Sequence, residues 1–157
     1  MAVGYTEQFV ERCAILATVD PGALTADTYN TDIIDMRYWR RVAFILLAGD
    51  IGSTDGTLQL QLYVNTASST SSPAPTAVTG KVFTAASFTG STDSNKQGII
   101  EITAEECETA LDAGRYLFGA LTVATQTNDA CVVAIGIDAR YGPGTAYDLA
   151  SVTEVIS

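Results

Sequence analysis

The residues with the most chemical potential in this sequence are three arginines around its single tryptophan. Arg37, Arg40 and Arg41 stand directly before the most apolar stretch of the chain, in the run IDMRYWRRVAFILLAGDIG. Guanidinium groups form planar, two-pronged ion pairs with carboxylates, and Asp32 and Asp35 precede them closely. Tryptophan and arginine are also enriched at contact surfaces between proteins. The cluster therefore indicates either local ion pairing or recognition of another chain.

Two interpretations of this cluster are open. In the first, the arginines pair locally or lie at the mouth of a strand while Trp39 caps the core. In the second, the cluster is a contact patch for another protein, together with residues near the C-terminus. The contact residues that this second interpretation predicts are Arg37, Trp39, Arg40, Arg41, Tyr141, Tyr147, Leu149 and Val152.

Enzymatic chemistry has little support in the sequence. There is no histidine, which removes Ser-His and Cys-His nucleophile pairs and histidine-containing zinc sites. Nucleophile-elbow and phosphate-loop motifs are absent as well. Glu105, Glu106 and Glu108 cluster as glycosidase carboxylates could, but acids that open a predicted helix more often complement its dipole. We therefore expect no enzymatic activity and no cofactor.

Two turn-like segments contain the oxygen ligands that calcium prefers. They are DIGSTDG (50–56) and TGSTDSN (89–95), and neither has the spacing of a calcium-binding loop. Ordinary turns explain both segments better, so we expect no bound metal.

Composition narrows the class of partner. The chain has 157 residues, enough for one domain with a sizeable core, and a net charge of -10 with only eight Lys plus Arg. Such a charge repels the phosphates of nucleic acids and anionic membrane surfaces, so we expect neither as a partner.

The cysteines and the apolar segments point to an intracellular origin. Cys13, Cys107 and Cys131 form no C-x-x-C pair and are expected to be reduced, buried thiols. The N-terminus lacks the basic residues of a secretion signal, and VAFILLA falls short of the ~20 apolar residues of a membrane span. We expect a soluble protein made in the cytoplasm.

Strands must position these residues. TLQLQLYVN (57–65) alternates apolar and polar residues, as a half-buried strand does, whereas RVAFILLAG (41–49) is apolar at both parities, which predicts a strand covered on both faces. The Gly- and Asp-rich connection predicts that the two form a hairpin over 40–65, and the strands 115–125 and 130–141 are predicted to form another.

The remaining elements complete an all-β fold. We expect strands at 98–103 and 81–88, exposed loops at 66–80 and 89–98, and a strand at CAILATV (13–19), although helix is an alternative there. One short helix is predicted within 103–114, with a Thr103–Glu106 capping box and Gly114 at its end. The sum is an antiparallel β-sandwich, jelly-roll-like, in a single domain 1–157 with possible arms at 1–30 and 142–157.

Three stretches carry a resemblance to a known family. DMRYWRRVAFILLAGDIG, EITAEECETALDAGRYLFGALTVAT and DARYGPGTAYDLASVTEVIS resemble small structural proteins encoded in the head-gene clusters of tailed bacteriophages and prophages. The resemblance extends over most of the chain from about residue 30 onward. It implies a virion component on the capsid surface: a head decoration or cement protein that binds major capsid subunits and forms a homo-oligomer, with a trimer as the guess.

Alternatives remain at this stage. One is a head-tail connector or tail component of the same particle. Another is a carbohydrate-binding β-sandwich that uses Tyr63, Trp39 or Tyr147 as a stacking platform. The segment 145–157 is predicted either to pack on a neighbouring subunit as an arm, by strand addition, or to form the last strand of the same domain.

Overall fold

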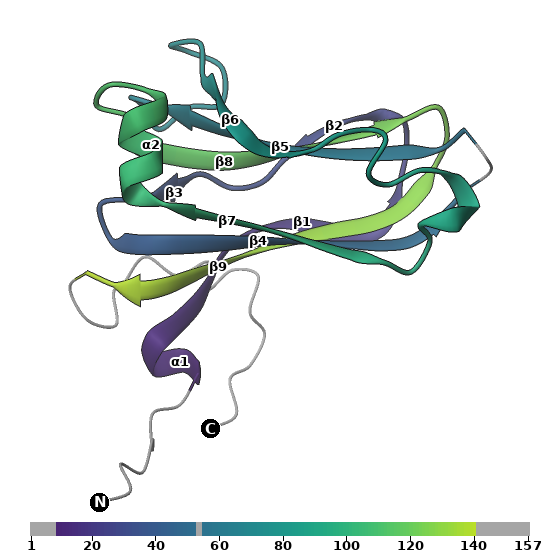
Figure 1. Ribbon diagram of the computed structural model, residues 1–157, viewed down its shortest axis with the longest axis horizontal. Coiled ribbons are helices and arrows are strands. Elements are labelled where there is room, and N and C mark those ends of the chain that lie inside the picture. The colour runs from purple at the N-terminus through teal and green to yellow at the C-terminus, as the bar shows by residue number, and fades with distance from the viewer. Residues whose placement is uncertain (1–8, 53–54, 141–157) are drawn as a thin grey trace, which may run out of the picture.

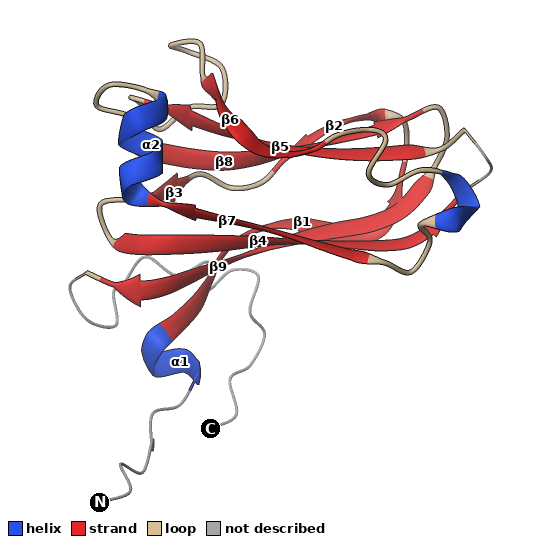
Figure 2. Cartoon of the chain, viewed as in Figure 1, coloured by secondary structure: helices blue, strands red, loops and turns tan. Residues whose placement is uncertain are grey.

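The computed structural model describes residues 9–52 and 55–140, and the structural statements below concern these residues. They form two antiparallel β-sheets packed face to face, with a short helix across one end (Figures 1 and 2). The predicted all-β sandwich with one short helix between its strands is therefore confirmed. A further single turn of helix precedes the first strand.

The elements follow one another along the chain with short connections. Their bounds are α1 Phe9–Arg12, β1 Cys13–Leu24, β2 Asp27–Asn30, β3 Ile34–Asp35, β4 Trp39–Ile51, β5 Thr57–Asn65, β6 Thr76–Phe83, the 3-10 turn η1 Gly90–Thr92, β7 Gln97–Thr103, α2 Ala104–Ala110, β8 Tyr116–Ala124 and β9 Asn128–Ala139.

The order of the strands defines a jelly roll. Sheet A has the order β1-β9-β4-β7, and sheet B has the order β2-β8-β5-β6, with β3 pairing β8 beyond the end of β2. If β2 and β3 are counted as one interrupted strand, the eight strands are ordered 1-8-3-6 and 2-7-4-5. Almost every connection between consecutive strands thus crosses from one sheet to the other, as in the two interlocked Greek keys of a jelly roll.

This topology overturns both predicted hairpins. The strands exist where expected, but β4 lies in sheet A and β5 in sheet B, and likewise β8 lies in sheet B and β9 in sheet A. Each Gly- or Asn-rich connection turns a corner between sheets instead of closing a hairpin. Local residue patterns identify a turn, whereas pairing is decided by contacts with strands far along the chain, such as β4 with β9.

Other boundaries also differ from expectation. The strand expected at 81–88 is β6 at Thr76–Phe83, so part of the predicted loop 66–80 belongs to sheet B. The strand interpretation of the N-terminal segment is confirmed by β1, and residues 13–30 are integral to the sandwich. Residues 1–8 and 142–157, the rest of the possible arms, lie outside the described residues.

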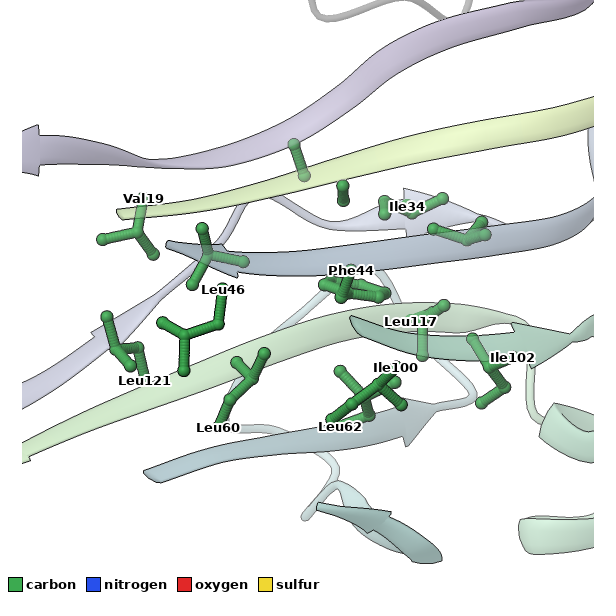
Figure 3. Packing of buried hydrophobic residues seen from close by; sticks show 14 of the residues in the cluster. Val19, Ile34, Phe44, Leu46, Leu60, Leu62, Ile100, Ile102, Leu117 and Leu121 are labelled. Atoms are coloured by element: carbon green, nitrogen blue, oxygen red, sulfur yellow. The ribbon is translucent and has the colours of Figure 1, made fainter. Parts of the chain in front are cut away.

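The core lies between the sheets. The alternation in β5 is confirmed, since Leu58, Leu60, Leu62 and Val64 are all fully buried. They meet residues of β4, β7 and β8 in the packing that Figure 3 shows around Phe44, Leu46, Ile100 and Leu121. Burial of such side chains drives the association of the two sheets.

β4 departs from its prediction. Val42, Phe44 and Leu46 point into the core, but the residues between them, Ala43, Ile45 and Leu47, retain exposure on the outer side. The expected cover on both faces of this strand is therefore not provided by the described residues.

The helix α2 closes one end of the sandwich (Figure 1). The predicted capping box is confirmed: the Glu106 N–H donates to Thr103 Oγ1 (3.2 Å) and the Thr103 N–H donates to Glu106 Oε2 (2.8 Å). The helix ends at Ala110, and Ala113 takes the left-handed conformation (φ 57°) in place of Gly114. Gly114 is needed for another reason, because a Cβ there would lie 2.6 Å from Val64 Cγ1.

None of the helices among the described residues is long and apolar enough to cross a membrane.

Candidate functional site at the arginine end

All six arginines of the sequence lie at one end of the sandwich, which we call the arginine end. Arg12 ends α1, and Arg37 lies in the turn before β4. Arg40 and Arg41 lie at the start of β4, Arg115 directly precedes β8, and Arg140 directly follows β9. Three of them, Arg37, Arg40 and Arg41, are close together in the sequence. The others escaped notice because their neighbours here are about a hundred positions away in the chain, and only the jelly-roll pairing brings them together.

The first group at this end surrounds Asp35 on β3. Arg115 grips the carboxylate with two nitrogens: Nε donates to Oδ1 (2.7 Å) and Nη2 donates to Oδ2. The Arg37 N–H also donates to Oδ1 (3.0 Å), and its guanidinium lies 3.4 Å from Oδ2. Burial alone would raise the pKa of Asp35, but these donors and charges hold it below its ordinary value. The pair also raises the pKa of Arg115, mainly through its hydrogen bond to Asp35.

The second group surrounds Asp138 on β9. Arg41 Nη2 donates to Asp138 Oδ2 (2.8 Å), and its Nη1 donates to Glu101 Oε1 (3.1 Å). Arg12 lies 3.5 Å from the other Asp138 oxygen. The hydrogen bond to Asp138 is the main cause of the raised pKa of Arg41. Only the Arg37–Asp35 pair is the local pairing that the sequence indicated, because Arg41 and Arg115 pair with carboxylates 60 to 97 positions away in the chain.

Two arginines stand apart from these groups. Arg40 and Arg140 are exposed, and neither guanidinium has an ion pair with a described residue. They line a shallow, open hollow together with Arg41 and Glu105, and Arg140 reaches a second hollow beside Arg37 and Arg115. Exposed guanidinium groups next to open hollows can pair with carboxylates of another molecule.

Trp39 takes the structural role of the two that the sequence left open. Its side chain is 2% exposed and lies against Gly136, where an added Cβ would approach the indole to 2.6 Å. Trp39 therefore caps the core, and the arginine side chains, not the indole ring, are exposed at the arginine end. Four predicted contact residues, Tyr141, Tyr147, Leu149 and Val152, lie outside the described residues.

The remaining candidates for chemistry have structural partners. Glu106 belongs to the capping box and lies 2.8 Å from Lys81 Nζ. Asp93, in one of the calcium-like loops, accepts from the Thr89 N–H and pairs with Lys96. Among the described residues, no group of three or more Asp, Glu or Cys is placed to hold a metal ion.

The three cysteines are free thiols in two settings. Cys107 is buried, as predicted, and burial raises its pKa to about 12, which keeps it as an unreactive thiol. Cys13 and Cys131 are only half-buried, contrary to the expectation for all three. Both lie on the outer side of sheet A.

Of the three residues predicted as a stacking platform, only Trp39 is ruled out by burial. Tyr63 stacks on Phe118 (ring centroids 5.6 Å apart) on the outer side of sheet B, whereas Trp39 is buried under sheet A. Tyr147, the third candidate, lies outside the described residues.

Comparisons with known proteins show only distant structural likenesses. No family model and no curated protein sequence matches the chain. A chain from the structure of infectious bursal disease virus, Gx strain, is similar over 85% of this chain and 32% of its own length, at 9% identity and a TM-score of 0.38. A family 11 carbohydrate-binding module from Clostridium thermocellum is similar over 88% of this chain and 95% of its own, at 13% identity and a TM-score of 0.36. This chain thus spans about a third of the viral chain, and likenesses at this level carry no functional conclusion.

Proposed function

We propose that this chain is a structural subunit of a tailed-bacteriophage particle that decorates or cements the head by binding major capsid subunits. The observation that carries the proposal is the strand order 1-8-3-6 and 2-7-4-5 in a chain without histidine. Jelly rolls of this kind occur in viral capsid proteins, in lectins and in cupins. The sequence resemblance to phage head-cluster proteins favours the first of these three.

The two other uses of the fold have less support. Fold alone does not assign function, so each use must be judged at its site. Histidine is the commonest metal ligand in proteins and is missing here, which disfavours a metal-dependent enzyme. Sugar binding by aromatic stacking needs exposed rings, and Trp39 is buried while one face of the Tyr63 ring is stacked on Phe118.

The arginine end supplies the contact with the shell. Arg40 and Arg140 are exposed cationic groups that can recognise an acidic protein surface. The net charge of -10 prevents a general attraction of the whole chain to anions. A subunit that binds only the assembled shell stabilises that shell by mass action. No turnover is required of it.

The experiment is co-sedimentation of the full chain with purified, expanded phage heads. We expect high, stoichiometric copy number and a raised melting temperature of the heads. Arg40→Glu should weaken binding at least about tenfold, as loss of a contact arginine does, while Lys96→Glu at the opposite end, with the same charge change, should not. Absence of binding would refute the proposal. A small fixed number of copies at a single vertex would instead establish the connector alternative.

A further inference from the structure

Sheet A carries apolar side chains on its outer side as well as on its inner side. Alternate residues of all four strands point away from sheet B and keep part of their surface exposed, most of all Leu47 (36%) and Ile99 (65%). We call this set the outer A face; it consists of Cys13, Ile15, Ala43, Ile45, Leu47, Ile99, Cys131, Val133, Ile135 and Ile137.

Strand register makes the outer A face continuous. Ile45 on β4 lies between Val133 on β9 and Ile99 on β7. One row further, Ile135 lies between Ala43 and Ile15, so apolar side chains adjoin one another across the sheet. Contiguous apolar surface of this kind marks contact sites in proteins that are otherwise soluble.

The two ends of the outer A face carry opposite charge. At the arginine end of sheet A, Arg40 and Arg140 are exposed and have no salt bridge with a described residue, and one carboxylate, Glu105, lines the same hollow, so the unpaired groups there are mainly cationic. At the opposite end, Asp20, Asp50 and Asp129 are exposed and have no salt bridge with a described residue. The face is therefore apolar in the middle, basic at one end and acidic at the other.

We propose that the outer A face binds the outer A face of a second copy of this chain, with the strands of the two copies antiparallel. A two-fold axis in the plane of the contact, perpendicular to the strands, buries the two apolar centres against each other. It also sets the arginine end of each copy over the aspartate end of the other. The symmetry therefore repeats the same attraction between basic and acidic groups at both ends of the contact. The parallel alternative would set like charges opposite each other.

This inference deepens the proposed function, on which it rests only in treating the chain as a subunit of an assembly. The two contacts share the arginine end but have different centres: the apolar self-contact includes Ile99 on β7, whereas head binding is assigned to Arg40 and Arg140 at the end of the sandwich. Self-association and head binding can therefore fail independently.

Sedimentation equilibrium of the full chain tests the apolar centre. We expect a species of twice 16.5 kDa that dissociates on dilution. Ile99→Lys should raise the dissociation constant about tenfold or more, because it places a charge in the contact. Gln59→Lys, on the outer side of sheet B, is the matched control and should leave the constant unchanged. Ile99 is mostly exposed, so far-UV circular dichroism and the unfolding midpoint should show that the variant folds.

A second pair of variants tests the orientation. Asp129→Lys should weaken self-association, and more strongly at low salt, because it removes the attraction to the partner's arginine end. Asp27→Lys makes the same charge change at the same end of the sandwich, but on sheet B, and should have no effect.

Native cysteines give an independent reading of the covered surface. Cys131 lies on the outer A face, and its modification by a maleimide should slow as protein concentration rises; Cys107, in the core, should stay unmodified throughout. A single-chain mass at every concentration, a trimer, or a dimer that tolerates Ile99→Lys would overturn the proposal.

The outcomes for self-association and for head binding can be told apart. If the Ile99→Lys variant is monomeric and still binds heads, both proposals stand. If the variant is monomeric and the wild-type dimer does not bind heads, only the proposed function is refuted.

Discussion

The outer sides of the two sheets differ although their inner sides are alike. On sheet B the outward residues are largely polar: Thr28 and Thr122 hydrogen-bond across strands (3.1 Å), and the Gln61 side chain donates to the Val78 and Lys81 carbonyls. Phe118 on that side is shielded by Tyr63. Sheet A has no such cover among the described residues. One fold thus presents a polar outer face on sheet B and an apolar outer face on sheet A, and only the outward residues make the difference.

The largest expected loss of stability is at Phe118, where Tyr63 covers an apolar side chain on the outer side of sheet B. Phe118→Ala should lower the free energy of unfolding by about 3–5 kcal/mol, because Phe118 is only 2% exposed. Ile135→Ala on the half-exposed outer A face should cost about 1 kcal/mol in dilute protein. Urea unfolding measures both. Equal losses in the free energy of unfolding would mean that the chain itself covers the outer A face, which would contradict the difference between the two sheets.

A somewhat smaller effect distinguishes the inner side of sheet A from its outer side. Gly136→Ala should destabilise the protein by about 1–3 kcal/mol, since the new Cβ would lie 2.6 Å from Trp39 and from Leu16. Gly22→Ala, in the same sheet with no atom within 4 Å of the new Cβ, is the control. A tolerated Gly136→Ala would show that Trp39 is free to move outward.

Two carboxylates allow the sheets to be compared at the arginine end. Asp35→Asn should cost about 1 kcal/mol at neutral pH, because it weakens a partly solvated, two-pronged pair with Arg115. The folded-state pKa of Asp35 is lowered, so the stability it contributes is present above its unfolded pKa and is lost as pH falls through the lower folded value. Wild type and variant should therefore converge in acid below about pH 4. Asp138→Asn on sheet A, the more exposed site, should cost less; a pH-independent difference for Asp35→Asn would contradict the assignment.

The smallest changes in the free energy of unfolding are expected for outward-facing residues, even where such a residue lies in the proposed self-contact. Leu47→Gln on the outer A face and Gln59→Leu on sheet B should each change the free energy of unfolding by less than about 0.5 kcal/mol. Leu47→Gln should weaken self-association, whereas Gln59→Leu, which lies outside the proposed contact, should leave it unchanged. Thermal unfolding and sedimentation of the same samples separate the two quantities.

The sequence predicts the elements of this fold better than their partners. Alternation in 57–65 and the Thr103–Glu106 spacing depend on neighbours within a few residues, and both predictions are confirmed. The hairpins failed because β4 and β5 face each other across the core instead of sharing hydrogen bonds. Turn composition alone does not distinguish these two outcomes.

The candidate site shows the same division. Pairing of Arg37 with Asp35 is local and could be anticipated, whereas Arg115 reaches Asp35 across 80 positions. In β4, the apolar residues at both parities were correctly recognised as a strand but assigned two covered faces. The pattern combines a core side with a partly exposed apolar side, and sequence periodicity does not distinguish an exposed apolar side from a covered one.

The pairing of β1 constrains how the protein can form during synthesis. Among the described strands it pairs with β9 alone, so the first of these strands to leave the ribosome must wait for the last. Until β9 has been made, the backbone of β1 has no hydrogen-bonding partner among the described strands of sheet A. We expect the nascent chain to remain unfolded at this edge until translation has passed residue 139, and to acquire protease resistance late and in a single step.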